Sequence, residues 1–401
     1  MNHVSSQASR VFAVLDELSI ELPSWGFADT GTRFGKFGQV AAAIDLNDKL
    51  ADAAQVNNLT GCCPQVAVHV LWDFPAGQQP AEVKTLAAQH GLRIGSINPN
   101  LFQDQQYKYG SLCHPDAGIR QQAMNHCIDS IKLGQAVDSR VVTLWLADGS
   151  NYPGQDNIRA RKGRLQECLQ TLHGHLSSEQ FFLLEYKPFE PAFYHTDIAD
   201  WGMSLSLARA MGSQAKVLVD TGHHYQSQNI EQIVAWLLDE GMLGGFHFND
   251  RRYADDDLTL ASIDPYQIFR IFYEILSYTY DTGQTPAIEY MVDQSHNLKP
   301  KIEAMIQTVM TAQELAAKAA MVDFELLADL QVKQDLIGCE RHLKQAFFTD
   351  VSGLIGEWRE GKGISADPLM AHRQSGYLEV VEKDRQQRRQ ELGIVTGGSY
   401  A

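Results

Sequence analysis

Short apolar segments with strand character alternate with longer segments of helical periodicity along most of the chain. Seven strand–helix units follow one another, with strands expected at 65–73, 93–102, 140–148, 180–188, 215–224, 243–250 and 285–293. An eighth strand fits at 19–28, ahead of a helical segment over about residues 40–58. Because each helix returns the chain to the start of the next strand, the strands must be parallel, and eight units close into an α/β fold of the (β/α)₈ TIM barrel type.

The 401 residues exceed what a barrel needs, and no strand pattern follows about residue 320. Two helical stretches, 328–348 and 367–392, lie beyond that point. A doubly wound dinucleotide fold is disfavoured because neither GxGxxG nor GxxxxGK[ST] occurs. We therefore expect a catalytic barrel with an N-terminal lid loop over 1–320. A C-terminal helical extension over 321–401 would make subunit contacts.

The charge balance excludes some classes of partner. The chain has 49 acidic and 33 basic residues, a formal net charge of −16, which repels nucleic-acid phosphates and anionic membranes. The acidic N-terminal segment does not read as a signal peptide, and no apolar run approaches a membrane span. We expect a cytoplasmic protein whose six scattered cysteines are reduced thiols, without CxxC spacing for a thiolate zinc site.

Ligand-type side chains gather at the ends of the last four strands, where barrels place their chemistry. They are Glu185, Asp220, His223, His247 and Asp293, with Asp255 and Asp257 just after the seventh strand. A lone histidine here would usually be structural, and a lone aspartate would usually cap a helix. Several carboxylates converging at low dielectric repel one another, so this mixture of carboxylates and imidazoles favours a divalent metal site.

The donor set indicates the kind and number of ions. Without cysteine it suits a hard or borderline ion such as Mn²⁺, Co²⁺ or Mg²⁺. Five carboxylates and two histidines exceed the needs of one ion, so two ions are expected to share a ligand, either His247 or a carboxylate. His224, beside His223 in VDTGHH, is expected to pack or support its neighbour.

Further polar and aromatic residues are expected near this mouth. Lys187 lies two residues after Glu185, His69 and Trp72 lie in the second predicted strand, and Trp145 lies in the strand predicted over 140–148. Bound ions can promote hydrogen transfer between neighbouring carbons, which is aldose–ketose isomerisation. The alternatives are metal-assisted hydrolysis by an endonuclease or phosphodiesterase, a sugar 3-epimerase with one ion, and a sugar-binding protein without activity.

Several stretches, taken in order, resemble L-rhamnose isomerase in its broad-specificity bacterial subtype, a relative of xylose isomerase. They are SWGFADTGTRFGKF, FLLEYKPFEPAFYHTDIADWG, VLVDTGHHYQSQNIEQIVAWL, LGGFHFNDRRYADDDLTLASIDPYQIF and the Asp of EYMVDQSHN. The resemblance covers nearly the whole chain. It implies a homotetramer with two divalent ions per subunit, Mn²⁺ first and Co²⁺, Mg²⁺ or Zn²⁺ as alternatives.

The resemblance also implies roles for individual residues. Glu185, Asp220, His247 and Asp293 would hold the tighter ion. His223, Asp255 and Asp257 would hold the second, sharing Glu185 or His247. Lys187 would bind a substrate oxygen, His69 would assist ring opening and Trp145 would pack along the sugar. Phe34 would belong to a mobile loop that shields the pocket, in this kind of tetramer the pocket of a neighbouring subunit.

The implied activity is conversion of the small aldose L-rhamnose to L-rhamnulose in carbohydrate catabolism. His69, Lys187 and Asp293 would be the catalytic side chains. Hydrogen would move between C1 and C2 of the opened sugar, either as a hydride or through a cis-enediol with Asp293 carrying protons.

Overall fold

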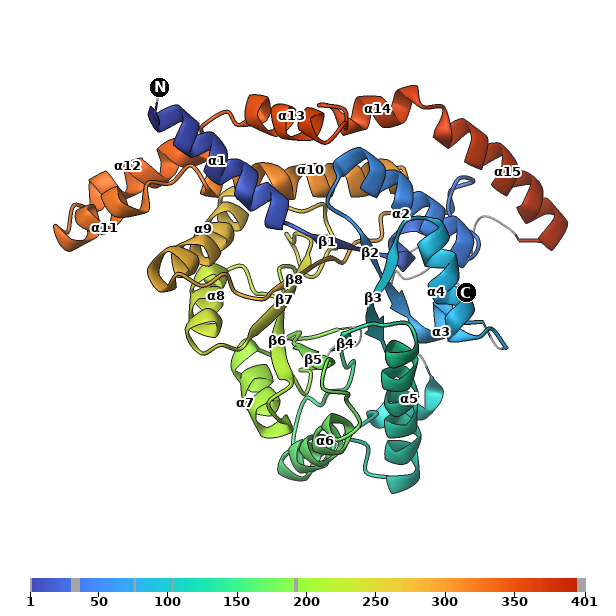
Figure 1. Cartoon of the computed structure of the whole chain (residues 1–401). Coiled ribbons are helices and arrows are strands. Elements are labelled where there is room, and N and C mark those ends of the chain that lie inside the picture. Colours follow the sequence, from blue (N-terminus) through green and yellow to red (C-terminus); the bar gives the residue numbers. More distant parts are fainter. Residues whose placement is uncertain (1, 30–36, 76, 103, 191–193, 395–401) are drawn as a thin grey trace.

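The computed structural model describes residues 2–29, 37–75, 77–102, 104–190 and 194–394. Eight parallel strands form a closed barrel in sequence order, and the pairing of β1 with β8 closes it (Figure 1). The predicted (β/α)₈ barrel is therefore confirmed. The strands are β1 (Ile20–Pro23), β2 (Gln65–His69), β3 (Arg93–Asn98), β4 (Val141–Leu144), β5 (Phe181–Glu185), β6 (Ala215–Asp220), β7 (Leu243–Phe248) and β8 (Glu289–Val292).

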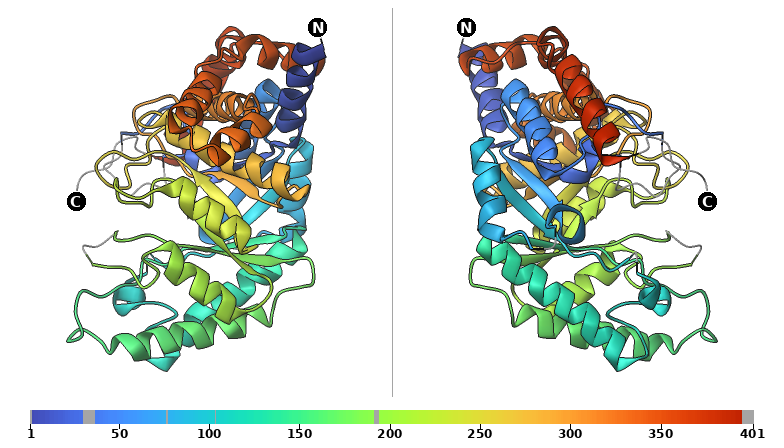
Figure 2. Two further views of the ribbon diagram at one scale, coloured as in Figure 1. Left: turned by 90° about the vertical axis from the view of Figure 1, so that its left-hand side faces the viewer. Right: turned by 90° about the vertical axis from the view of Figure 1, so that its right-hand side faces the viewer.

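Helices surround the barrel and cover its outer face (Figures 1 and 2). Those up to the eighth strand–helix unit are α1 (Asn2–Glu17), η1 (Ser24–Phe27), α2 (Leu46–Thr60), α3 (Val70–Asp73), α4 (Pro80–Gln89), η2 (Gln105–Tyr109), α5 (Ala117–Ala136), α6 (Ile158–His173), α7 (Trp201–Met211), α8 (Ile230–Asp239), α9 (Pro265–Thr282) and α10 (Lys301–Ala319). The extension comprises α11 (Phe324–Val332), α12 (Leu336–Phe347), α13 (Ser352–Gly361), α14 (Pro368–Gln374) and α15 (Tyr377–Leu392).

A small apolar cluster fills the barrel interior. Val141, Leu183, Leu218 and Met291 lie on different strands and are buried against one another. Side chains two positions apart on a strand share a face. The residues two positions after Leu183, Leu218 and Met291 therefore point into the same interior, one level nearer the mouth. This packed layer is the floor on which the polar groups rest.

Several predicted strands are longer than the observed ones. The segment predicted as a strand over 65–73 divides into β2 and the short helix α3. The buried carboxylate of Asp73 accepts hydrogen bonds from the backbone N–H of His69 (2.9 Å) and from Ser24 Oγ (2.6 Å), and it pairs with Lys49 Nζ at 2.6 Å. These contacts draw Asp73 back toward the end of β2, so the chain turns there.

The C-terminal extension lies along one side of the barrel (Figures 1 and 2). Its last helix, α15, is fastened to α2 by Arg385, which is 1% exposed and pairs with Asp52 at 2.8 Å. Helices α11 and α12 extend away from the barrel and leave large apolar side chains exposed, namely Val332, Leu336, Ile337 and Phe348. We call these four residues the apolar tip.

Two further findings concern the described part of the chain. All six cysteines lie within it, five of them buried, and none is in a disulfide, as the sequence predicts. No helix among the described residues combines the length and apolar character that crossing a membrane requires.

Candidate metal centre and sugar-binding mouth

Strand geometry brings four predicted ligands to one level of the barrel. Glu185 and Asp220 are the last residues of β5 and β6, and Asp220 is paired in register with His247 on β7. Asp293 follows β8 directly, and its backbone N–H continues the ladder by donating to Phe248 O at 3.1 Å. These side chains are therefore positioned by main-chain hydrogen bonds of the barrel itself.

We call Glu185, Asp220, His247 and Asp293 the strand cluster. Each offers one potential ligand atom, and these atoms all lie within 4.8 Å of one another. His247 Nδ1 lies 3.2 Å from Glu185 Oε1, 3.8 Å from Asp220 Oδ2 and 3.9 Å from Asp293 Oδ2. One imidazole facing three carboxylates is a donor set that suits a divalent cation.

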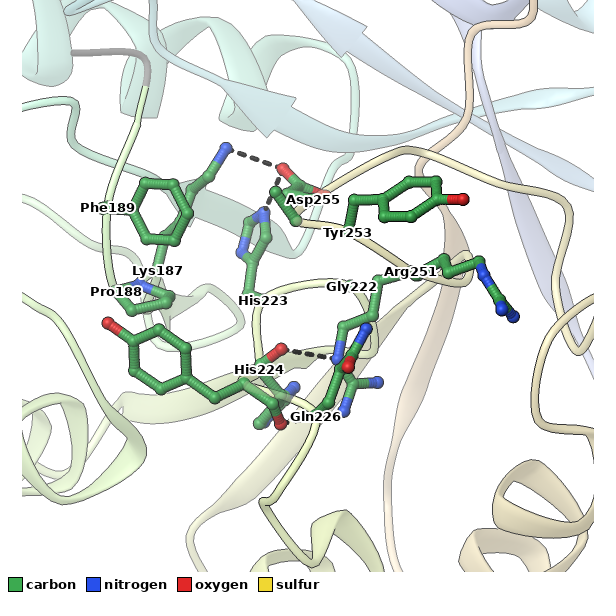
Figure 3. A pocket seen from close by; sticks show the side chains of 13 residues that line it. Lys187, Pro188, Phe189, Gly222, His223, His224, Gln226, Arg251, Tyr253 and Asp255 are labelled. Atoms are coloured by element: carbon green, nitrogen blue, oxygen red, sulfur yellow. Dashed lines mark hydrogen bonds and ion pairs between the residues drawn. The ribbon is translucent and has the colours of Figure 1, made fainter. Parts of the chain in front are cut away.

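A second group, the loop cluster, consists of Asp220, His223 and Asp255. His223 Nε2 lies 3.1 Å from Asp255 Oδ2 and 3.8 Å from Asp220 Oδ2. Lys187 Nζ approaches the same Asp255 oxygen at 2.6 Å, and a cavity of about 220 Å³ borders the group (Figure 3). Asp220 belongs to both clusters, so it lies between two candidate cation positions. Glu185 Oε1 also lies 3.2 Å from Nδ1 of both His223 and His247.

The buried charges of the strand cluster shift one another's titration. Burial alone would lower the pKa of His247, but the carboxylates of Glu185, Asp293 and Asp220 outweigh it and raise that pKa to about 10. Burial, together with the nearby Asp255 and Glu185 carboxylates, raises the pKa of Asp220 to about 7 against the opposing effect of the histidines. A bound cation would favour the ionised carboxylate and the neutral imidazole.

Two details fit these clusters to cations. Among the described residues His247 Nδ1 has no hydrogen-bond partner, although it is buried and faces three carboxylates. His223 Nδ1 lies 3.0 Å from the carbonyl oxygen of Tyr186 and can donate its proton there. The lone pair of His223 Nε2 then points into the loop cluster, as a metal ligand requires.

The structure does not bring Asp257 into either cluster of described ligand atoms. The prediction that Asp255 and Asp257 reach one point assumed an extended loop, in which alternate residues share a side. Asp257 instead has a positive φ of 49°, so the chain turns at this residue. Its role as a ligand stays a prediction.

The first half of the barrel contributes an aromatic wall, the rings of Trp25, His69, Trp72, Phe102 and Trp145. The His69 ring centroid lies 4.7 Å from that of Trp25 and 4.1 Å from that of Trp72, and the Phe102 ring lies 5.1 Å from Trp145. The Trp145 ring also faces Lys187 Nζ at 5.3 Å. Flat apolar rings beside a charged group can hold the apolar face of a sugar while its hydroxyls reach polar atoms.

Two polar atoms in this wall are available to a ligand. His69 Nδ1 and Trp145 Nε1 are buried and make no hydrogen bond to any described residue. Burial, with the nearby charges of Lys49 and His247, lowers the pKa of His69 to about 3. The imidazole of His69 is therefore neutral at pH 7 and can accept or donate a proton through its ring nitrogens.

Sequence reasoning did not single out two supporting residues. Asn249 Nδ2 contacts both carboxylate oxygens of Asp220 (3.2 and 3.3 Å) and the carbonyl oxygen of Asp293 (3.2 Å). Trp25 Nε1 donates to Asp293 Oδ1 at 2.9 Å. The position of Asn249 directly after β7 was the available signal, whereas nothing in the sequence pattern links Trp25 to residue 293.

Two residues singled out in the sequence, His224 and Phe34, are not members of either cluster as the structure describes them. His224 faces away from both clusters, and its Nε2 lies 2.6 Å from the Tyr186 hydroxyl. Phe34 lies outside the residues that the structure describes, so its predicted role in shielding the pocket stays a prediction.

Curated relatives and solved structures are similar to this chain. Proteins named "Probable sugar isomerase" from Mesorhizobium japonicum and Rhizobium meliloti are 36% and 37% identical over 392 and 371 residues. The alignments cover 96% and 91% of this chain and 89% and 86% of those relatives. The D-allulose 3-epimerase from Methylomonas sp. superposes with a TM-score of 0.53 at 13% identity, over 73% of this chain and 96% of that one, which shows a shared fold alone.

The match to a protein family covers the greater part of the barrel. Residues 64–270 match the family described as "Xylose isomerase-like TIM barrel". This stretch runs from just before β2 into α9 and includes most of the residues of both clusters. Together with the identity to the two full-length relatives, it shows that the chain belongs to the xylose isomerase-like TIM barrel family.

Proposed function

We propose that this protein is a metal-dependent aldose–ketose isomerase that converts L-rhamnose to L-rhamnulose. The observation that carries the proposal is a pair of adjoining ligand clusters that share Asp220, with the Lys187 ammonium beside them. The relatives named as sugar isomerases support the reaction class. L-rhamnose as the substrate rests on the resemblance of the sequence motifs.

Two divalent cations are assigned to the two clusters, and Mn²⁺ is the preferred ion in this proposal. Glu185, Asp220, His247 and Asp293 would hold one, and Asp220, His223 and Asp255 the other, with Asp257 as a further candidate. When bound, such cations polarise a carbonyl group and its neighbouring hydroxyl group. The N/O donor set without thiolate suits Mn²⁺, Co²⁺ or Mg²⁺, and Zn²⁺ can also use it.

The side chains of the mouth have separate tasks in this proposal. His69, neutral and with Nδ1 available, would move the proton that opens the pyranose ring. Lys187 would donate hydrogen bonds to a sugar oxygen, and Trp145 would pack along the sugar. In the enediol route the carboxylate of Asp293, held by Trp25, would carry a proton between C1 and C2. Solvent deuterium at C1 of the product would exclude a pure hydride shift.

A sugar 3-epimerase with one ion is the nearest alternative in the same fold. The presence of a second ligand cluster supports two ions and so favours isomerisation. Elemental analysis of protein saturated with Mn²⁺ separates the two, because one ion per subunit would favour the epimerase. A nuclease or phosphodiesterase is disfavoured by the net charge of −16.

The activity test uses protein stripped with EDTA and incubated with L-rhamnose, with and without Mn²⁺, while ketose formation is followed. We expect ketose only with the ion. Loss of a ligand, as in Asp220→Asn, should abolish ketose formation. The matched control is Asp239→Asn, which removes an exposed carboxylate at the end of α8 and should leave turnover unchanged. No ketose from L-rhamnose at saturating Mn²⁺ would overturn the substrate assignment, and no product from any aldose would overturn the reaction class.

We also propose a cytoplasmic homotetramer in which residues 321–401 make subunit contacts. The apolar tip on α11 and α12 supports this, because Leu336 and Ile337 are 75% and 77% exposed on the isolated subunit. Exposed apolar side chains in such a group are typical of protein interfaces. Sedimentation should give a tetramer, and Ile337→Glu should shift it toward smaller species. A monomeric wild-type protein would contradict the assembly.

A further inference from the structure

Arg251 is a buried arginine, and three of its side-chain hydrogen bonds go to backbone carbonyl groups of the loop after β6. A fourth goes to Gln267 Oε1 on α9 at 3.3 Å. Its side chain is 7% exposed, and its Nε donates to His224 O at 2.5 Å. Its two terminal nitrogens donate to Thr221 O at 3.0 Å and to Tyr225 O at 3.2 Å. A guanidinium group with donors in a fixed plane can hold several carbonyl groups at once, and these three flank His223.

This arginine connects the two loops that supply the loop cluster. Arg251 lies in the loop after β7, four residues before Asp255. The carbonyl groups that it binds belong to the loop after β6, which carries His223 (Figure 3). No such link is needed for the strand cluster, because neighbouring strands already align its ligands through the barrel ladder.

Tyr186 holds the same loop from its other side. Its carbonyl oxygen lies 3.0 Å from His223 Nδ1, and its hydroxyl oxygen lies 2.6 Å from His224 Nε2. His223 is therefore located by contacts from the β5 and β7 loops, in addition to its own backbone. A small displacement of either contact would move Nε2 relative to Asp255.

We propose that Arg251 is a positioning residue for the second cation, acting through the backbone of the His223 loop. The inference rests on the proposed function, since it requires that the loop cluster binds a metal ion. Loss of the arginine fork should weaken binding at the loop cluster and leave the strand cluster unaffected. Outer contacts of this kind typically change metal affinity by about 10–100-fold.

The test is titration of EDTA-stripped full-length protein with Mn²⁺, with free Mn²⁺ measured by electron paramagnetic resonance. Wild-type protein should bind two ions per subunit. Arg251→Lys retains the positive charge but loses the planar fork, so its second Kd should rise by about 10-fold or more while the first Kd stays constant. Arg252→Lys, at the exposed neighbouring position, is the matched control and should bind both ions like wild type.

The outcomes separate the possible failures. An unchanged second Kd in Arg251→Lys, or an equal rise in both Kd values with a lower Tm, would overturn the positioning role. If Arg251→Lys does not fold, Arg251→Gln carries the same test, because the shorter amide cannot hold the three carbonyl groups at once. Wild-type protein that binds no Mn²⁺ would overturn the proposed function together with the inference.

Discussion

The two clusters lie side by side but are supported in different ways. The strand cluster stands on β5, β6, β7 and the residue after β8, so the barrel that holds the fold together also sets its geometry. The loop cluster takes only Asp220 from a strand and obtains His223 and Asp255 from loops. The loop that carries His223 depends on the side chain of Arg251 and on the hydroxyl and carbonyl groups of Tyr186.

This difference indicates which ligands at the barrel mouth are held rigidly and which can move. Ligands on paired strands can move only if the barrel deforms, whereas ligands on loops can move through changes in a few hydrogen bonds. We therefore expect the strand cluster to bind its ion more tightly and the loop cluster to respond more to substitutions outside it. Four predictions test this contrast, from the largest expected effect on metal binding to the smallest.

The largest effect is expected from Asp220→Asn, because this carboxylate belongs to both clusters. Both ions should bind more weakly and turnover of L-rhamnose should fall by more than about 100-fold, beyond what loss of an outer contact causes. Mn²⁺ titration and ketose formation are the two measurements. Near wild-type activity would show that Asp220 is not a shared ligand.

The second prediction compares one histidine from each cluster. His223→Gln should reduce bound Mn²⁺ from two ions to one per subunit and leave the tighter site intact, whereas His247→Gln should weaken the tighter site. The physical reason is that His223 Nε2 lies 3.1 Å from Asp255 of the loop cluster, whereas His247 Nδ1 lies 3.2 Å from Glu185 of the strand cluster. His223 approaches Glu185 only with its other ring nitrogen, Nδ1, at 3.2 Å. Equal loss of both ions in both variants would remove the distinction.

A smaller effect is expected from Gly222→Ala in the His223 loop. A Cβ atom there would lie 2.7 Å from Asn249 Oδ1 and 2.8 Å from Asp255 Oδ1, so those side chains must shift. We expect the second Mn²⁺ to bind about 10-fold more weakly, within the range for disturbed outer contacts. Gly163→Ala in α6 has open space around its Cβ and is the matched control. Unaltered binding in Gly222→Ala would mean that the loop adjusts freely.

The last prediction concerns the barrel floor and should leave both ions in place. Glu21 is buried and accepts hydrogen bonds from the backbone N–H and the hydroxyl of Ser96. Burial raises the pKa of Glu21 from 4.5 to about 7, against the effect of those hydrogen bonds. Its folded-state pKa is above its unfolded value, so its contribution to stability is greatest below pH 4.5 and declines as the pH rises through about 7.

Glu21→Gln imitates the protonated acid and should remove this loss. The free energy of unfolding should rise relative to wild type by up to about 3 kcal/mol at pH 8 and change little at pH 4.5. Denaturant unfolding at several pH values measures the difference, and Mn²⁺ binding is the control. A variant that is destabilised equally at both pH values would show that the ionised carboxylate is needed there.

Periodicity was sufficient to predict the barrel, because eight strand–helix units in order leave few other arrangements. It also located the ligand-type residues, since the carboxyl ends of parallel strands meet at one rim. It could not show that Asp73 folds back on His69 and ends β2 early, because that contact depends on Lys49 and Ser24, which are distant in sequence. Local patterns contain no information about such long-range partners.

The same limit applies to the loops of the site. Two acidic residues at alternate positions, Asp255 and Asp257, suggested a common direction, but the positive φ at Asp257 breaks the extended geometry. Arg251 resembles any charged residue after a strand, and three of its partners are backbone carbonyl groups, which every residue has. Contacts that depend on loop conformation can therefore be recognised only in the three-dimensional structure.

The division of the mouth into an aromatic wall and a ligand-bearing half has an evolutionary consequence. The wall comes from the end of β2 and from the segments after β1 to β4, and both clusters come from β5 to β8 and the loops after them. In the proposed isomerase, the residues that contact the sugar and the residues that promote hydrogen transfer would therefore be encoded by successive stretches of the gene. Exchange of the first stretch between homologues would then be expected to change the substrate and leave the reaction chemistry unaltered.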